Sequence, residues 1–225
     1  MRFCVFLGAV MALGLTALFS PRANADGPAP MVFSLVEHDG ATVVVAEGRI
    51  DANSAARLRA LLDTAGTAPR AIHLTSPGGR LDGGLALGRA IREAGLAARV
   101  GSPQSHGAPS DPSLCASACA YAFLGGVDRR VGAAAVIGFH DIYPAAGQGT
   151  IAPERLAAAT GAAMVRLRAY VAEMGAHPNL PDLAVEAGRD RLFVPRGLHL
   201  WQLGIETSPD MALVTGGDFG GADRL

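Results

Sequence analysis

A serine set between two cysteines is the first group in this sequence that could do chemistry. The stretch CASACAYAFLGG runs from Cys115 to Gly126 and places Ser117 at the start of a run of small and apolar residues. A serine hydroxyl becomes an effective nucleophile when a neighbouring base takes its proton. Serine is also a common helix N-cap, because its hydroxyl satisfies free N–H groups of the first helical turn. Ser117 is therefore either a candidate nucleophile or a cap.

His140 is the candidate base for Ser117. It follows the apolar run Ala133–Phe139, which we expect to be a buried strand. All 19 basic residues of the chain are Arg, and the absence of Lys excludes a Ser-Lys pair, a Lys Schiff base and a phosphate-loop Lys. Histidine is thus the partner available to the serine. The alternative for His140 is a hydrogen-bonded structural histidine.

Two glycines could supply a site for a negatively charged oxygen. Gly78 and Gly79 stand in SPGGR, where an apolar strand gives way to a helix. Glycines at such a place let backbone N–H groups approach an anion closely, although an ordinary tight turn has the same composition. The small side chains of Ala116 and Ala118 would let a substrate carbonyl reach both the Ser117 hydroxyl and the Ala118 N–H.

Strand and helix periodicities alternate along the chain and must position these residues. We expect strands at Val32–Val36, Thr42–Ala46, Ala71–Leu74, Ala97–Val100 and Ala133–Phe139. We expect helices from Asp51 to before Gly66, and at Leu81–Ala94, Ser117–Leu124, Pro153–Met174, Leu180–Ala187 and Arg196–Leu203. Leu156, Met164, Val165, Leu167 and Val171 form the expected apolar side of the longest helix. Strands regularly separated by helices predict a single-domain α/β fold with largely parallel pairing, whose loops at strand ends carry the site.

The N-terminus has the pattern of an export signal. Arg2 precedes an uncharged apolar run from Phe3 to Phe19, and Ala23-Asn24-Ala25 is a small-x-small cleavage site. We expect residues 1–25 to be removed, residues 26–215 to form the domain and the Gly-rich residues 216–225 to be a tail. This predicts a periplasmic or secreted protein with no membrane span after cleavage.

Charge and cysteine content narrow the classes of function. The whole chain has a net charge of 19 − 20 = −1, and removal of Arg2 and Arg22 with the signal makes it 17 − 20 = −3. A nucleic-acid binder would show clustered basic residues, which the sequence lacks. Cys4 leaves with the signal, so Cys115 and Cys119 are the cysteines of the mature chain. Their three-residue spacing does not fit the C-x-x-C redox motif.

The order of three motifs resembles a known family. SPGGRLDGGLALGRAI, then CASACAYAFLGG, then IGFHD is similar to the pattern of the Clp protease proteolytic subunit and its exported relatives in the ClpP/crotonase superfamily. The step from Ser117 to His140 is 140 − 117 = 23 residues, close to the spacing in that family. The resemblance extends from Gly48 to Leu203-Gly204-Ile205. It implies a ClpP/crotonase-like spiral of strand-helix units.

The resemblance also implies roles for individual residues. Ser117 matches the nucleophile and His140 the general base, while Gly79 and Ala118 match the two backbone donors of the oxyanion hole. Asp190 matches the third member of the triad, because Gly188 to Pro195 follows the family's arrangement around its acid, and Asp182 is the second choice. Asp141 is a poor orienter of His140, since neighbours along a strand point to opposite faces.

The expected function is that of an ATP-independent serine peptidase acting on peptides or unfolded proteins outside the cytoplasm, through an acyl-enzyme on Ser117. It would need no cofactor and no metal, and the resemblance implies a homo-oligomer. The alternative is a catalytically silent binding or scaffold protein on the same fold. Cys115 and Cys119 either form a disulfide that fixes the serine turn or are two buried small apolar residues.

Overall fold

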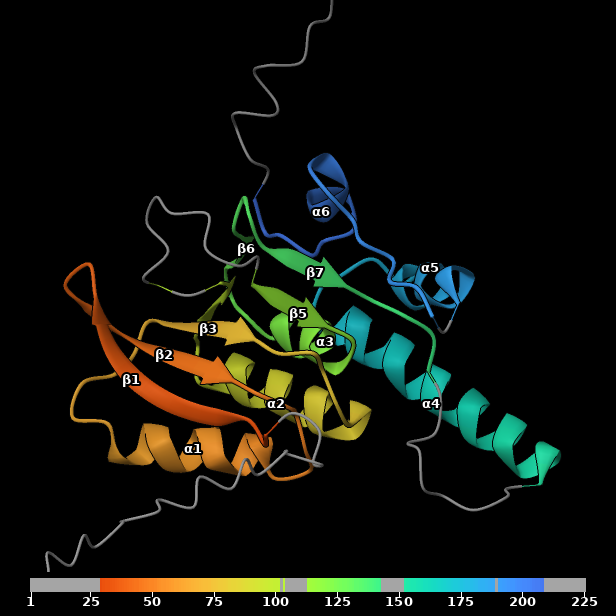
Figure 1. Ribbon diagram of the computed structural model, residues 1–225, viewed down its shortest axis with the longest axis horizontal. Helices are drawn as coiled ribbons and strands as arrows, with labels where there is room; N and C mark the ends of the chain where they lie inside the picture. Colours follow the sequence, from red (N-terminus) through yellow and green to blue (C-terminus); the bar gives the residue numbers. More distant parts are fainter. Residues whose placement is uncertain (1–28, 102, 104–112, 143–151, 189, 209–225) are drawn as a thin grey trace, which may run out of the picture.

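The computed structural model describes residues 29–101, 103, 113–142, 152–188 and 190–208 (Figure 1). The expected signal at 1–25, most of the loop after Gly101 and the expected tail at 216–225 lie outside the described residues.

A five-stranded sheet of order β1-β2-β3-β4-β6 forms the body of the molecule. β1 (Val32–His38) and β2 (Ala41–Glu47) pair antiparallel around a tight turn, in which Asp39 and Gly40 have φ of 50° and 72°. β2, β3 (Ala71–Thr75), β4 (Ala97–Val100) and β6 (Arg129–Val131) are parallel. The expected α/β class with largely parallel pairing is confirmed, and the predicted strands β1 to β4 differ from the observed ones by at most two residues at an end.

A second, two-stranded sheet carries the serine element. β5 (Leu114–Ala116) runs parallel to β7 (Val136–Gly138), and a bridge between Ser76 and Cys115 joins β5 to the end of β3. The predicted strand Ala133–Phe139 was too long, because Ala133 and Ala134 form an exposed turn and Phe139 makes only an isolated bridge to Phe193. β5 and β6 have only three residues each, and the sequence pattern predicts no strand at either place.

Three helices pack together beside the sheet and bury its core. α1 (Ser54–Thr64), α2 (Leu81–Glu93) and α3 (Ala118–Phe123) lie side by side, and α3 also contacts β3, β4 and β5 (Figure 1). In β3, the buried Ile72 and Leu74 alternate with the half-buried His73 and Thr75, the period of a strand with one face on the core. The α3 residues are all buried, which explains their small and apolar types.

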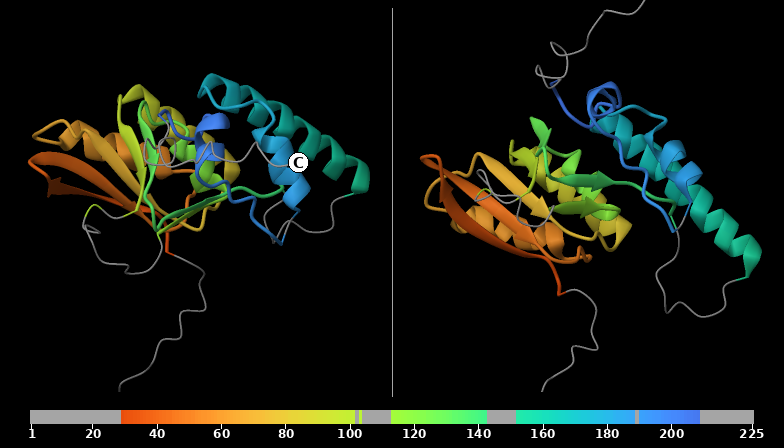
Figure 2. Two further views of the ribbon diagram at one scale, coloured as in Figure 1. Left: turned by 90° about the horizontal axis from the view of Figure 1, so that it is seen from above. Right: turned by 45° about the horizontal axis from the view of Figure 1, so that its top comes forward.

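The C-terminal helices lie on the side of the molecule away from the β1–β2 hairpin (Figure 2). They are α4 (Pro153–Glu173), α5 (Leu180–Ala187) and α6 (Leu198–Gln202). Only Ala163, Leu167, Tyr170 and Val171 of α4 are buried, and Val165 is 67% exposed. The predicted apolar side was wrong at Val165, because the buried face of α4 covers fewer positions than the apolar residues of this helix occupy. No helix in the described ranges is both long and apolar enough to cross a bilayer.

Candidate active site

Ser117 occupies a sharp turn between β5 and α3. Its backbone has φ 59° and ψ −123°, and the only other described non-glycine residue with positive φ is Asp39 in the hairpin turn. Such a conformation costs a side-chain-bearing residue about 1–3 kcal/mol and persists only where its surroundings impose it. The nucleophilic serines of α/β-hydrolases occupy strained strand-to-helix turns of this kind, which present the hydroxyl outward.

The Ser117 hydroxyl does not serve as a helix cap. Ser117 is the N-cap residue of α3 by position, yet its side chain makes no capping hydrogen bond. Its backbone is held by the Gly138 carbonyl, which accepts from the Ser117 N–H at 2.8 Å. The side chain is only partly buried, while the residues on both sides of it are buried. The structure therefore removes the main support for the simple N-cap interpretation.

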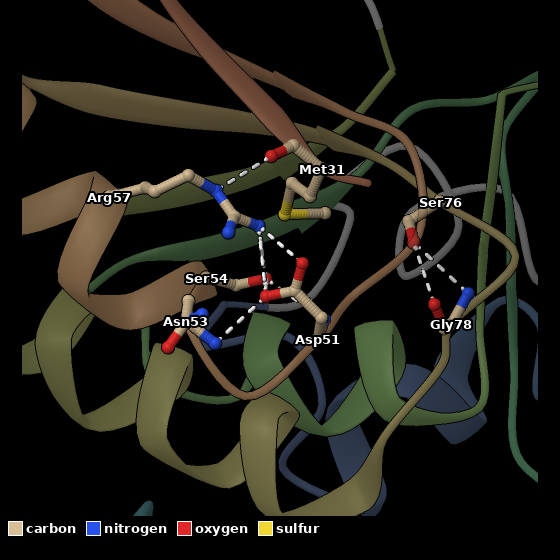
Figure 3. Close-up of polar contacts among 7 residues, drawn as sticks. All are labelled: Met31, Asp51, Asn53, Ser54, Arg57, Ser76 and Gly78. Carbon is tan, nitrogen blue, oxygen red and sulfur yellow. Dashed lines mark hydrogen bonds and ion pairs between the residues drawn. The ribbon is translucent and has the colours of Figure 1, made fainter. Parts of the chain in front are cut away.

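Gly78 lies directly against the serine turn. A Cβ on Gly78 would fall 2.7 Å from the Ser117 Cβ, 2.6 Å from the Ala116 carbonyl oxygen and 3.1 Å from the Ala118 nitrogen. Gly78 also has φ 97°, a value that favours glycine. Its N–H donates to the Ser76 hydroxyl at 3.0 Å, which fixes the turn that follows β3 (Figure 3). The SPGG segment thus packs closely against Ser117, and no side chain fits at position 78.

Gly79 and Ala118 can present two amide N–H groups to one site. Ile50 donates its N–H to the Gly78 carbonyl at 2.8 Å and accepts from the Arg80 N–H at 3.0 Å. In such a parallel bridge the N–H of the residue between, Gly79, points away from Ile50. Among the described residues, neither the Gly79 N–H nor the Ala118 N–H has a hydrogen-bond acceptor. Two unpaired donors beside a serine are what an oxyanion hole requires.

A charged cluster supports the segment that holds Gly79. Asp51 follows Ile50, and its carboxylate accepts hydrogen bonds from Arg57 at 2.9 and 3.0 Å and from the Asn53 N–H at 2.8 Å (Figure 3). Arg57 also donates to the Met31 carbonyl at 3.1 Å. The Arg57 hydrogen bond lowers the pKa of Asp51 below its ordinary value of 3.8. This network fixes the start of α1, which begins at Ser54 and not at Asp51 as the sequence suggested.

His140 lies at the end of the strand that pairs with the serine strand. The last register pair of β5 and β7 is Ala116 with Gly138, so Ser117 and His140 follow one and two residues later at the same edge. The His140 Nδ1–H donates to the Asp141 carbonyl at 2.6 Å. Because a carbonyl only accepts, Nδ1 carries the proton in this arrangement and Nε2 is the basic nitrogen of the neutral ring. A general base needs this tautomer.

Ser117 and His140 lie at the same strand edge, and no hydrogen bond joins the Ser117 hydroxyl to His140 in the part of the chain that the structure describes. Within the described part of the chain, the Ser117 Oγ makes no hydrogen bond to any residue. Catalytic hydrogen bonds in unliganded enzymes are often long and tighten when the substrate binds. The topology thus brings the two residues to one strand edge.

The two carboxylates suggested as the third member differ in their surroundings. Asp190 belongs to a segment that runs antiparallel beside His140, because Phe193 forms a bridge with Phe139 and the Gly188 carbonyl accepts from the Asp141 N–H at 3.4 Å. Asp190 is exposed, and no described residue forms a hydrogen bond or ion pair with it. Asp182 is in the first turn of α5 and pairs with Arg168 at 2.5 Å. The group that contacts His140 Nδ1 is the Asp141 backbone carbonyl, a contact that sequence patterns do not reveal. The assignment of Asp190 stays a prediction.

Cys115 and Cys119 form a disulfide, with their Cα atoms 5.2 Å apart. Both are fully buried, Cys115 in β5 and Cys119 in α3. Of the two alternatives open from the sequence, the structure has the cross-link. No group of three or more His, Cys, Asp or Glu side chains in the described ranges is arranged to hold a metal ion.

Ser76 is a further residue beside Ser117 for which the sequence pattern predicts no role. Its side chain is buried and bonds to the Gly78 backbone, and its own backbone pairs with β5 on both sides of Cys115. A signal for it existed, because a serine placed two residues before a glycine often bonds the backbone of its own turn.

Comparison with known proteins gives a likeness among solved structures but none among family models or curated proteins. Among solved structures, the chain is similar to a serine-to-alanine mutant of the 1510-N membrane-bound stomatin-specific protease, with 18% identity, 70% of this chain and 73% of that chain covered, and a TM-score of 0.48. The α/β assignment made above rests on the strands and helices themselves.

Proposed function

We propose that this chain is a serine hydrolase of the peptidase type, which acts without ATP on peptides or unfolded proteins outside the cytoplasm. The observation that carries the proposal is the Ser117 turn. It combines a non-glycine residue at positive φ, a hydroxyl that caps no helix, and N–H groups at Gly79 and Ala118 that have no acceptor among the residues the structure describes. A helix start without catalytic use has no need of the backbone strain.

The reaction follows from the placement of these groups. His140 Nε2 takes the proton from the Ser117 Oγ as the hydroxyl attacks the substrate carbonyl carbon. The Gly79 and Ala118 N–H groups bind the oxyanion of the tetrahedral intermediate, and one such donor contributes about 3–4 kcal/mol. His140 then protonates the leaving amine. Water, activated by the same histidine, hydrolyses the acyl-enzyme.

The imidazole needs an orienting group throughout the reaction. The Asp141 carbonyl can hold the Nδ1 proton in place. Asp190 is the carboxylate that the motif order proposes for stabilising the imidazolium. The rival function is a silent binding protein, favoured by the exposed position of Asp190 and the backbone partner of His140.

Export and self-association belong to the same proposal. The apolar N-terminal run and the Cys115–Cys119 disulfide both support an oxidising compartment, the periplasm or the cell exterior. The exposed Val165 on α4, a helix that extends beyond the sheet in Figure 1, supports a homo-oligomer, which sedimentation analysis would detect.

The test of the hydrolase is covalent labelling with a fluorophosphonate probe. Wild type and Ser34→Ala, which alters an exposed serine on β1, should label equally. Ser117→Ala should not label, and His140→Ala should label at least a hundredfold more slowly. Absence of labelling in folded wild type would reject the hydrolase and favour the binding protein. Labelled protein would then be used to screen unfolded polypeptides and peptides by competition.

A further inference from the structure

The disulfide spans the turn that carries Ser117, with one cysteine two residues before the serine and the other two residues after it. Cys115 lies in β5, where it is paired with Ile137 of β7, and Cys119 lies in the first turn of α3. Both sulfur-bearing residues have no exposed surface. The bond is therefore part of the packed core beneath the serine and not a surface cross-link.

The disulfide joins cysteines only four residues apart, and this restricts how the turn between them can fold. Four residue steps of extended chain would span about 13 Å. The observed Cα separation of Cys115 and Cys119 is 5.2 Å. The strand direction of Cys115 and the helical position of Cys119 are compatible with this separation because the chain reverses at Ser117. An extended path through Ala116, Ser117 and Ala118 is incompatible with the intact bond, because bridged cysteines lie within about 7 Å of each other.

The strained backbone of Ser117 has an obvious way to relax. A serine at a helix start normally has φ and ψ in the β region and uses its hydroxyl to cap the helix. Relaxation to that state would turn the hydroxyl toward the N–H groups of the first turn of α3. The hydrogen bonds on either side of the turn, such as Ser117 N–H to Gly138 and Ala120 N–H to the Ser117 carbonyl, can break one at a time.

We infer that the Cys115–Cys119 disulfide is a positioning device, which holds Ser117 in its strained, reactive conformation and prevents its relaxation to an ordinary helix cap. Cys115 and Cys119 touch no reacting atom, and they act through the backbone of the residues between them. The inference rests on the proposed hydrolase for its catalytic readout, but not for its structural one.

The test compares Cys115→Ala/Cys119→Ala with wild type and with Ile72→Val. Ile72 is fully buried in β3, so its variant loses core volume without touching the serine turn. Labelling kinetics with the fluorophosphonate probe separate the affinity for the probe from the maximal labelling rate. The double variant should keep its affinity within about threefold and lose at least tenfold in maximal rate, whereas Ile72→Val should match wild type in both.

A second measurement keeps the inference independent of activity. Hydrogen exchange on peptides covering residues 114–124 should show faster exchange at the start of α3 in the double variant and not in Ile72→Val. If the double variant does not fold, Cys119→Ala removes the bond and leaves the strand cysteine in place. Wild-type labelling rates and unchanged exchange in the variant would overturn the inference. A wild type that fails to label rejects the hydrolase, and the exchange data then decide the positioning role alone.

Discussion

The position that a side chain on Gly78 would occupy lies 2.7 Å from the Cβ of Ser117. Two residues that are 117 − 78 = 39 positions apart in the sequence therefore pack directly against each other. This contact couples the turn after β3 to the turn before α3, and it makes the first prediction possible.

Gly78→Ala should abolish or strongly slow labelling of Ser117. The new methyl group would meet the Ala116 carbonyl oxygen at 2.6 Å as well as Ser117, so the serine turn must move. Gly40→Ala is the matched control, because Gly40 also has positive φ but no atom within 4 Å of an added Cβ. Both variants should lose about 1 kcal/mol or more of stability through backbone strain. Equal labelling rates in the two variants would contradict the contact.

Asp51→Ala should slow labelling without unfolding the protein. The Asp51–Arg57 pair fixes the segment in which Ile50 pairs with Gly78 and Arg80. Because both side chains are partly exposed, we expect a stability loss of about 1 kcal/mol or less. The labelling rate should fall several-fold as the Gly79 N–H loses its fixed direction. Glu93→Ala, which breaks the exposed pair with Arg59, should change neither quantity.

Removing the disulfide should cost little global stability. The cross-link closes a loop of only five residues, 115 to 119, for which chain entropy gives about 2 kcal/mol. Denaturant unfolding of Cys115→Ala/Cys119→Ala should show a loss of that order. A loss more than twice as large would mean that the bond supports the whole core and not chiefly the serine turn.

Arg129 should be essential for stability, unlike its neighbour Arg130. The Arg129 guanidinium is buried and donates to five backbone carbonyls, which belong to Leu124, Gly126, Met174, Gly204 and Ile205. Burial lowers its pKa to about 10. Arg92 also donates to the carbonyls of Leu124, Gly126 and Met174. Arg129→Met would leave the Gly204 and Ile205 carbonyls without a donor among the described residues, so we expect a loss of about 3 kcal/mol or more. The exposed Arg130→Met should change stability by less than about 0.5 kcal/mol.

Stability should fall as the pH drops below 6.5, with His73 as one cause. Burial lowers the pKa of His73 below its ordinary value of 6.5, and the nearby His38 and Arg99 act in the same direction. A hydrogen bond with the Gly101 carbonyl opposes this shift without reversing it. The unfolded chain takes up a proton near pH 6.5 while the folded chain does not, so protonation favours unfolding. Urea unfolding between pH 8 and pH 5 should show this decline. His73→Gln should make it shallower, and an unchanged slope would assign the decline to other groups.

The sequence by itself determined the α/β class, the strands β1 to β4 and the helices α2, α4 and α5 to within one or two residues. These elements are long enough for their apolar period to be read locally. It also placed Ser117 at a strand-to-helix turn and His140 at a strand end, because the motif order is a local property.

Tertiary structure decided what no local pattern encodes. β5 and β6 have three residues each, and their hydrogen bonds come from strands distant in the sequence. The positive φ of Ser117 is imposed by Gly138, by the contact with Gly78 and by the disulfide. The carbonyl on His140 Nδ1 and the ion pair of Asp182 likewise depend on which chain segments meet. Side-chain chemistry can be read from a sequence, but distances between its parts are set only when the core packs.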